Sequence, residues 1–297
     1  MFCPLGRQLG SAYIGLLRYP PVLPWIAVAL VLSPVSVFLR RRWPALGLQP
    51  LRARHTMRAI PALAISVYAR HLRAFVPIGL LPVPFAGASA LLTLVHLSPD
   101  DWLPPEIAPA LGIPGFILAF VVTAFVQAST AAALGEVADG RSPGALTGFG
   151  IALRRMKVVL PALLGTAPRV FVYGITLVGA PWALKRYVDW IFTIQVATLS
   201  DSGPRASWRR SALLVKGSWW RTLLFTTAVW AVAPWLPVIL GLPLLALFAG
   251  QPELVELFGV LAYGLLLPLA VLANTLLYFD LEARRPLETE RTAAPLG

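Results

Sequence analysis

The stretch GIPGFILAFVVTAFVQASTAAAL, residues 112–134, decides the fold class because none of its side chains is charged. A helix of this length rises about 35 Å, and the hydrocarbon core of a bilayer is about 30 Å thick. The stretch therefore predicts a transmembrane helix. Six further apolar runs have a similar character, and they lie near 22–39, 74–97, 158–180, 183–200, 223–248 and 254–278. Together they predict an all-α, polytopic transmembrane helix bundle with about seven spans.

Two of these runs need separate treatment. The run 183–200 carries Lys185, Arg186 and Asp189 in its first third, so we expect a tilted, short or partly interfacial helix there. The run 22–39 is long enough for a signal sequence, but three arginines, Arg40 to Arg42, follow it at once without a small-residue cleavage pattern. A retained membrane anchor fits that pattern better.

The composition supports a lipid environment. The 297 residues are 58% hydrophobic and 13% charged, whereas soluble domains have about 25% charged residues. The net charge of +12 does not indicate a nucleic-acid-binding protein, because the basic residues form short clusters between long apolar runs. Anionic lipid headgroups are the expected counter-charge. A single cysteine, Cys3, excludes an intramolecular disulfide and a multi-cysteine metal site.

The distribution of Lys and Arg predicts the orientation. The segments 40–73, 135–157 and 201–222 and the tail from 278 together hold 20 of these residues, and the opposite side of the predicted spans holds four. By the positive-inside rule, the N-terminus is outside and the C-terminus is cytoplasmic. The predicted outer loop from Ser98 to Leu111 contains three acidic residues and no basic one.

Three basic segments on the predicted cytoplasmic side share one plan. ARHLRAFVPIGLL (69–81), LRRMKVVLPALLG (153–165) and RRSALLVKGSWWRTLLF (209–225) each lead from basic residues into an apolar run. The first two align without gaps and place Pro77 over Pro161. A helix from about Pro204 to Lys216 would set Trp208, Ala212 and Val215 on one stripe. We expect it to be an amphipathic helix in the headgroup plane, with a buried indole.

Two motifs resemble a known family. They are GPRASWRRSALLVKGSWWR (203–221) and LLYFDLEARR (276–285), and 134–164 adds a loop with Gly140 and Arg141 at its turn. These residues resemble the membrane domain attached to some bacterial glycerophosphodiester phosphodiesterases, a family that also has stand-alone multi-pass members. The matching positions are Arg210, Ser211, Gly217, Trp220, Arg221, Tyr278, Asp280 and Leu281. The chain departs from the family at Ser200, where a glutamate is usual, so a role for an acid there is in doubt.

The resemblance implies a domain organisation. It covers about 57–285 as a six-span membrane domain, so 1–56 is expected to be an N-terminal transmembrane anchor with a basic cytoplasmic linker. Residues 286–297 would be a short cytoplasmic tail. The protein itself is expected in the bacterial plasma membrane. The phosphodiesterase barrel of that family needs roughly 250 further residues, for which the chain has no room.

Arg169 is the only ionisable residue near the middle of a predicted span. A charge at that depth is costly, so it suggests a pathway lining or a lipid-phosphate contact. The competing interpretations are a structural ion pair or a span boundary that places Arg169 near an interface. His55, His71 and His96 lack metal-ligand spacing, and we expect them, like the acidic pair Asp100–Asp101, to be solvated surface.

The remaining candidates lie at the predicted cytoplasmic boundary. We expect Asp280 to pair with Arg210 or Arg221, tying the 204–216 helix to the last span. The candidate lipid-binding or structural motif comprises Arg209, Arg210, Ser211, Gly217, Trp220, Arg221 and Asp280.

The sequence contains no nucleophile motif, phosphate loop or zinc signature, so no catalytic residue, metal or cofactor is expected. We interpret the chain as a non-catalytic membrane protein, a lipid-interacting scaffold or transport-associated component. Its expected partners are anionic headgroups and a membrane or cytoplasmic protein. The alternatives are a transporter or lipid translocator with Arg169 near its path and, least favoured, a membrane-embedded enzyme acting on phospholipid headgroups.

Overall fold

The computed structural model describes residues 50–85, 107–176, 178–231 and 252–285. The chain divides into two compact units, one of Met1–Pro44 with Pro234–Tyr263 and the other of Ala45–Ala233 with Gly264–Gly297. Of the first unit, only 252–263 are described, as the beginning of a helix. The second unit holds every candidate residue that the structure describes.

The described residues form helices joined by short turns, and none of them lies in a strand. The helices are α3 (Ala59–Arg70), α4 (Leu72–Leu80), α6 (Ile107–Ala138), α7 (Ala145–Gly174), α8 (Ala180–Asp189), α9 (Thr193–Leu199), α10 (Pro204–Val215) and α12 (Pro252–Arg284). A further helix begins at Trp219 and is described as far as 231.

Three of the described helices have stretches long and apolar enough to cross a membrane: Ile117–Ala138, Ala145–Gly174 and Phe258–Arg284. They belong to α6, α7 and α12. The prediction of an all-helical chain with helices able to cross a membrane is thus confirmed for the described residues, and three of the seven predicted spans have such a helix. The predicted spans 112–134 and 254–278 lie inside α6 and α12.

The other predicted spans have different outcomes. The run 22–39 lies outside the described residues, as do the second halves of 74–97 and 223–248. The run 158–180 is not one helix, because α7 ends at Gly174 and α8 begins only at Ala180. A continuous helix over 183–200 is also wrong, since α8 ends at Asp189 and α9 begins at Thr193.

The core of the second unit forms where α6, α7 and α9 meet. Ala128, Ala152, Val159, Ile194 and Ala197 are all buried in one cluster. Small residues allow these helices to approach closely: a Cβ added at Gly148 of α7 would lie 2.9 Å from the carbonyl oxygen of Ser129 on α6. The short helix α9 is enclosed by this packing, with residues 193–198 all buried.

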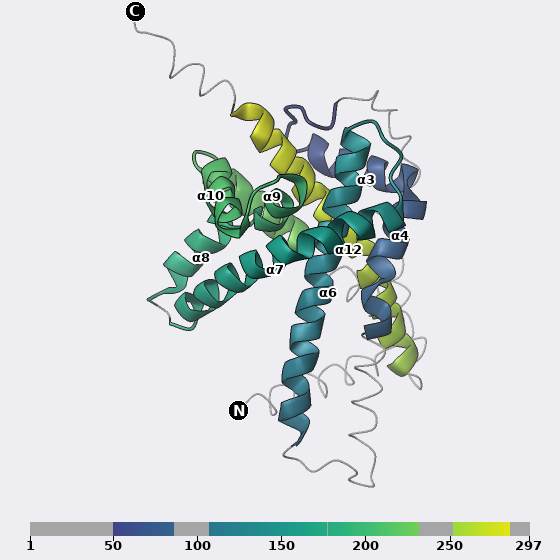
Figure 1. Cartoon of the computed structure of the whole chain (residues 1–297), viewed down its shortest axis with the longest axis vertical. Coiled ribbons are helices and arrows are strands. Elements are labelled where there is room, and N and C mark those ends of the chain that lie inside the picture. The colour runs from purple at the N-terminus through teal and green to yellow at the C-terminus, as the bar shows by residue number, and fades with distance from the viewer. Residues whose placement is uncertain (1–49, 86–106, 177, 232–251, 286–297) are drawn as a thin grey trace, which may run out of the picture. The chain divides into compact units, whose positions relative to one another are not determined.

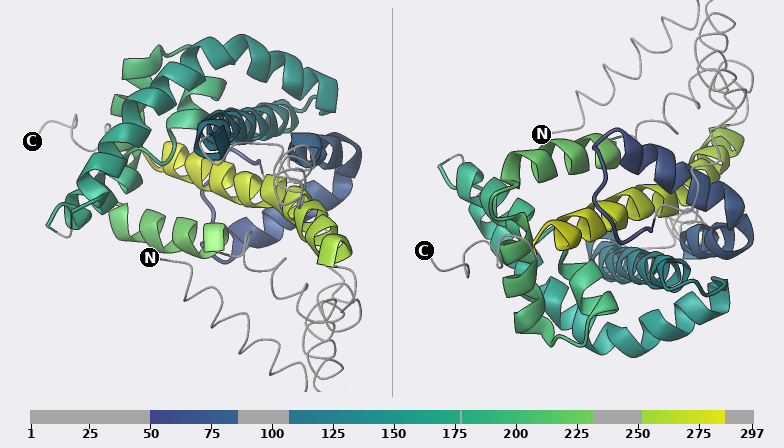
Figure 2. Two further views of the ribbon diagram at one scale, coloured as in Figure 1. Left: turned by 90° about the horizontal axis from the view of Figure 1, so that it is seen from below. Right: turned by 90° about the horizontal axis from the view of Figure 1, so that it is seen from above.

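The two helices α6 and α7 run in different directions. In Figure 1, α6 runs from bottom to top, whereas α7 begins below the upper end of α6 and runs sideways across it. Figure 2 shows the same arrangement from below and above, where α7 lies along the plane of the view and α6 is foreshortened. α8 turns back along α7, and α10 packs against α7, α8 and α9.

Candidate functional site at the end of α12

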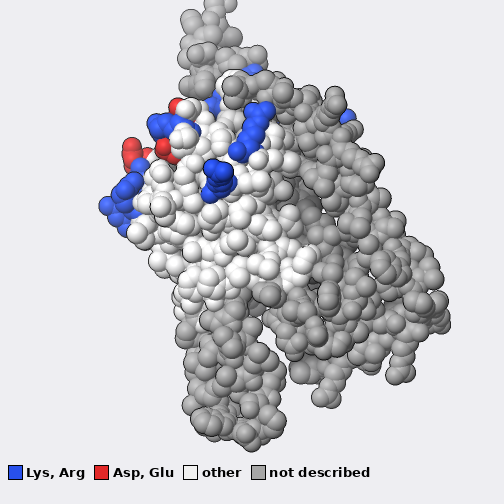
Figure 3. All heavy atoms as spheres, turned by 90° about the vertical axis from the view of Figure 1, so that its right-hand side faces the viewer, with Lys and Arg blue, Asp and Glu red and all other residues white. Residues whose placement is uncertain are grey.

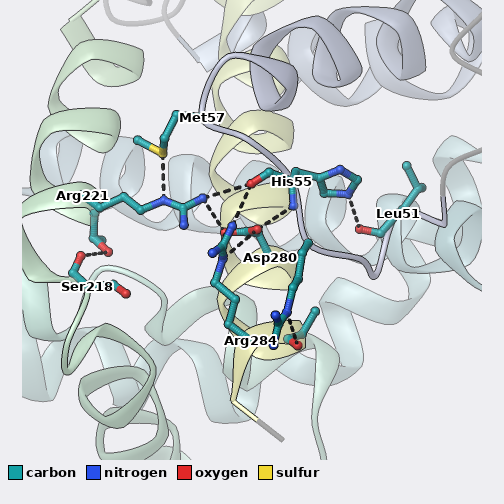
Figure 4. Close-up of polar contacts among 10 residues, drawn as sticks. Leu51, His55, Met57, Ser218, Arg221, Asp280 and Arg284 are labelled. Atoms are coloured by element: carbon teal, nitrogen blue, oxygen red, sulfur yellow. Dashed lines mark hydrogen bonds and ion pairs between the residues drawn. The ribbon is translucent and has the colours of Figure 1, made fainter. Parts of the chain in front are cut away.

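The most connected polar group of the described chain is the carboxylate of Asp280, in the last two turns of α12. Its side chain is fully buried, and the backbone N–H of His55 donates a hydrogen bond to Oδ1 at 2.7 Å. Arg221 Nη2 donates to Oδ2 at 2.6 Å, and Arg284 Nε lies 3.0 and 2.9 Å from Oδ1 and Oδ2. Figure 4 shows the carboxylate between the two arginines and His55. We call Asp280, Arg221, Arg284 and the backbone of His55 the Asp280 cluster.

The two arginines of the cluster bind more than the carboxylate. Both donate to the carbonyl oxygen of His55, from Arg284 at 2.9 Å and from Arg221 at 3.2 Å. The Nε of Arg221 also lies 2.9 Å from the sulfur of Met57. Burial lowers the pKa of Arg221, while the Asp280 carboxylate opposes that shift. The cluster thus has two cations and one anion, and both cations also bind the backbone of His55.

The segment 50–57 is fixed by these contacts. His55 is 3% exposed, and its Nε2 lies 3.3 Å from the carbonyl oxygen of Leu51. The prediction that His55 is solvated surface is therefore wrong, because the surrounding arginines bind its backbone and hold the segment against α12. Arg52 extends the contact, since its guanidinium lies 4.9 Å from the centre of the Phe279 ring and 3.2 Å from Asp139.

Asp139 belongs to the turn between α6 and α7, which has its own ion pairs. Arg141 binds Glu136 at 2.6 Å and Asp139 at 2.9 Å. The hydrogen bond to Glu136 raises the pKa of Arg141. Gly140, expected at this turn, has a φ of 74°, a conformation that favours glycine.

A second carboxylate of α12, that of Glu282, binds α10. It pairs with Arg210 and accepts a hydrogen bond from the hydroxyl of Tyr278 at 3.2 Å. Of the two partners expected for Asp280, the structure therefore gives Arg221, and Arg210 pairs with Glu282, two residues further along the same helix. The expected link between the 204–216 helix and the last span runs through Glu282.

Three further motif residues shape the backbone around α10. The hydroxyl of Ser211 donates to the carbonyl oxygen of Asp189 at 2.8 Å and accepts from the N–H of Phe192 at 3.2 Å. It thereby joins α10 to the break between α8 and α9. Gly217 has a φ of 86° where the chain turns into the next helix. Trp220 is 70% exposed and makes an edge contact with Trp219 at 4.8 Å between ring centres.

The indole of Trp208 is docked on α7. Its Nε1 donates to the carbonyl oxygen of Ala162 at 2.9 Å, and a Cβ added at Gly165 would lie 2.1 Å from its ring. The guanidinium of Arg169 lies 5.1 Å from the centre of the same ring, a cation–π contact, and Arg169 is itself exposed. The indole expected to be buried is half-buried, and it packs against α7.

The outward face of α10 is basic. Arg205 and Arg209 are exposed one turn apart, followed by Leu213 after another turn. Within the described part of the chain, no carboxylate lies within ion-pair distance of Arg205 or Arg209. An open cavity of about 420 Å³ lies beside Arg205, lined also by Pro161 and Trp208.

Charged side chains gather near one end of the described surface. On the face shown in Figure 3, the described Lys, Arg, Asp and Glu side chains lie toward the top, and the described surface below them is uncharged. On this face, an uncharged surface lies beside a charged end, which is a pattern found in proteins embedded in lipid.

The site contains residues that the sequence did not single out. Sequence reasoning missed His55, Glu282 and Arg284 as contributors. Arg284 could have been predicted, because it follows Asp280 by one helical turn in a segment expected to be helical. Oppositely charged residues at this spacing are positioned to form an ion pair. Across the described residues, no group of three or more His, Cys, Asp or Glu side chains is placed to hold a metal ion. His96, Asp100 and Asp101 lie outside these residues.

Comparison of the chain with protein-family models, with curated proteins and with solved structures gives no match.

Proposed function

We propose that this chain is a non-catalytic, multi-pass protein of the bacterial plasma membrane, whose basic cytoplasmic surface binds anionic lipid headgroups. In that role it serves as a lipid-interacting scaffold or a transport-associated component. We propose further that the N-terminus of the chain is outside the cell. We also propose that the chain belongs to the glycerophosphodiester phosphodiesterase membrane-domain family.

The observation that carries this proposal is the asymmetry of α10. Its inner side is fixed by Ser211, by the docked Trp208 and by the pair of Arg210 with Glu282. Its outer side presents Arg205 and Arg209, which have no acidic partner among the described residues. Basic side chains on a rigid helix beside an apolar belt suit the phosphates of anionic lipids.

The pair Arg209 and Arg210 offers a matched test. The two residues are adjacent on α10, and each substitution by Gln removes one charge. We expect Arg209→Gln to weaken the preference of the purified protein for phosphatidylglycerol over phosphatidylcholine by about 1 kcal/mol, or about fivefold. Arg210→Gln should weaken this preference less, because Arg210 binds Glu282 and is not available to a lipid phosphate.

Spin-labelled lipids added to the reconstituted protein measure this preference directly. Equal losses for the two variants would contradict a specific role of the outer face of α10. Equal binding of the two lipids by the unaltered protein would contradict the proposal as a whole.

The transporter alternative rests on Arg169. The guanidinium of Arg169 stacks on the ring of Trp208, a contact that accounts for this residue without a transport pathway. A flux lost on Arg169→Leu, with Trp208 still docked, would favour transport.

A further inference from the structure

The helix α7 has the length and apolarity of a membrane span, but its contacts place it differently. From Ala145 to Arg169 it rises about 36 Å, more than the roughly 30 Å of the hydrocarbon core. An upright α7 would therefore carry Arg169 to the side of the membrane opposite its first residue.

The turn before α7 is tied to the end of α12. Asp139, in this turn, binds Arg52 at 3.2 Å, and the guanidinium of Arg52 lies 4.9 Å from the centre of the Phe279 ring. Asp139, six residues before the first residue of α7, thus lies near the level of Phe279.

The later part of α7 is tied to the same end of α12. Arg169 and Gly165 contact Trp208 of α10, and two residues further on, Arg210 pairs with Glu282. Phe279 and Glu282 are three residues apart, a rise of about 4.5 Å along α12. Asp139 and Arg169 are therefore both held near this end of α12, and α7, which lies between them in the chain, runs sideways in Figures 1 and 2.

The turn between α7 and α8 is apolar and exposed. The exposed fractions are 69% for Phe171, 63% for Val172, 68% for Ile175, 80% for Val178 and 59% for Trp182. Among the described residues, this tip is not covered by protein. In water such a set of side chains would be a costly surface, so it calls for an apolar surrounding.

Basic residues stand beside this tip. Lys185 and Arg186 are exposed on α8, where Arg186 lies 5.5 Å from the centre of the Trp190 ring, and Arg169 is exposed on α7. An apolar tip with basic residues and a tryptophan around it has the composition of a segment that enters one leaflet and keeps its charges at the headgroups.

We propose that α7 and α8 form a hairpin that dips into the cytoplasmic leaflet and returns, instead of crossing the membrane twice. Its apolar tip contacts acyl chains, and Arg169, Lys185 and Arg186 contact anionic headgroups of that leaflet. In this arrangement, neither of the predicted spans 158–180 and 183–200 crosses the membrane. Because two crossings are removed together, the orientation of all the other predicted spans is unchanged.

The charge distribution agrees with this topology. Lys185 and Arg186 were two of the four basic residues assigned to the outer side, and the hairpin moves them to the inner side. Only Arg7 and Arg18 then remain outside, which strengthens the positive-inside asymmetry. Arg169 no longer has to lie in the hydrocarbon core.

Cysteine labelling tests the hairpin, because Cys3 is the chain's single cysteine and Cys3→Ser gives a cysteine-free protein. Three single-cysteine variants are made in it. Val178→Cys reports the tip, Ser142→Cys the exposed turn before α7, and Asp100→Cys the outer loop expected from the sequence. Each is treated with a membrane-impermeant maleimide in spheroplasts and in inside-out vesicles.

We expect Val178→Cys to escape labelling from the side that labels Asp100→Cys. A fluorophore attached at Val178→Cys should be quenched by lipids with a nitroxide near the headgroup, more than one attached at Asp100→Cys. Labelling from the same side as Asp100→Cys would overturn the hairpin. A fluorophore at the tip that nitroxide lipids do not quench would overturn it too, since the tip would then contact protein.

The inference rests on the proposed membrane location but not on lipid binding by α10. If the hairpin fails, the Val178→Cys and Asp100→Cys variants are labelled from one side, whatever the lipid preference of Arg209→Gln. If only the headgroup role of α10 fails, Arg209→Gln has the same lipid preference as the unaltered protein. Val178→Cys and Asp100→Cys then still differ in the side from which they are labelled.

Discussion

Replacing Asp280 by Asn tests what the Asp280 cluster contributes to stability. Asn has nearly the same shape and keeps one oxygen that can accept from the N–H of His55. It removes the negative charge, however, and turns an amide NH₂ toward Arg221 or Arg284. The change leaves two cations beside each other without a counter-ion.

The expected loss follows from the burial of the three side chains. Removing one partner of a buried ion pair costs about 3–5 kcal/mol. Asp280 is fully buried, but the side chains of Arg221 and Arg284 are 23% and 37% exposed, so water can recover part of that loss. We therefore expect Asp280→Asn to lower the free energy of unfolding by about 2–3 kcal/mol.

Glu282→Gln is the matched control. It removes an acid of the same helix that pairs with Arg210, where the two side chains are 30% and 44% exposed. Such a pair contributes about 0–1 kcal/mol. Unfolding of both variants by sodium dodecyl sulfate in mixed micelles, followed by circular dichroism, measures the difference. Equal losses for Asp280→Asn and Glu282→Gln would refute the argument from burial.

Two further predictions concern α7 and the pH. Gly165→Ala places a methyl group 2.1 Å from the docked ring of Trp208, and we expect melting curves to show a loss of about 1–3 kcal/mol. Gly150→Ala in the same helix meets no atom within 4 Å and should stabilise by about 0.5–1 kcal/mol; a loss as large as that of Gly165→Ala would contradict the reasoning. Burial, and then Arg70, lower the pKa of His71, so the folded state binds its proton less readily than the unfolded state. The stability of the protein should therefore fall as the pH drops through about 6.5. Melting curves from pH 7 to pH 5 should show a smaller loss of stability for His71→Gln.

Some helices could be predicted from the sequence because their signal is local. The run 112–134 has no charge, and a lipid-facing or buried helix is the only regular way to satisfy its backbone. Gly140 and Gly217 were expected at turns, and both have a positive φ. Such features depend on a few neighbouring residues.

The course of α7 could not be predicted in this way. Hydropathy reports whether a helix can enter a membrane, but not whether it stands upright or lies across its neighbours. That direction depends on contacts between distant residues, such as Trp208 with Gly165 and Arg52 with Asp139. The choice of Arg221 for Asp280 and of Arg210 for Glu282 also depends on how α10 lies against α12.

The burial of His55 shows the same limit. A histidine among three arginines in RARHTMR normally indicates solvated surface. Its backbone N–H and carbonyl oxygen are nevertheless bound by Asp280, Arg221 and Arg284, which are far away in sequence. A local pattern of side chains carries no information about a backbone group that binds a distant carboxylate.

The bond between His55 and Asp280 also has a consequence for biosynthesis. The two residues are 225 positions apart, so the ribosome must synthesise the chain as far as the end of α12 before the carboxylate can reach the segment 50–57. Until then, Arg221 lacks its counter-ion and the segment 50–57 lacks its bond to Asp280. A product truncated before residue 280 therefore leaves Arg221 without its buried carboxylate partner.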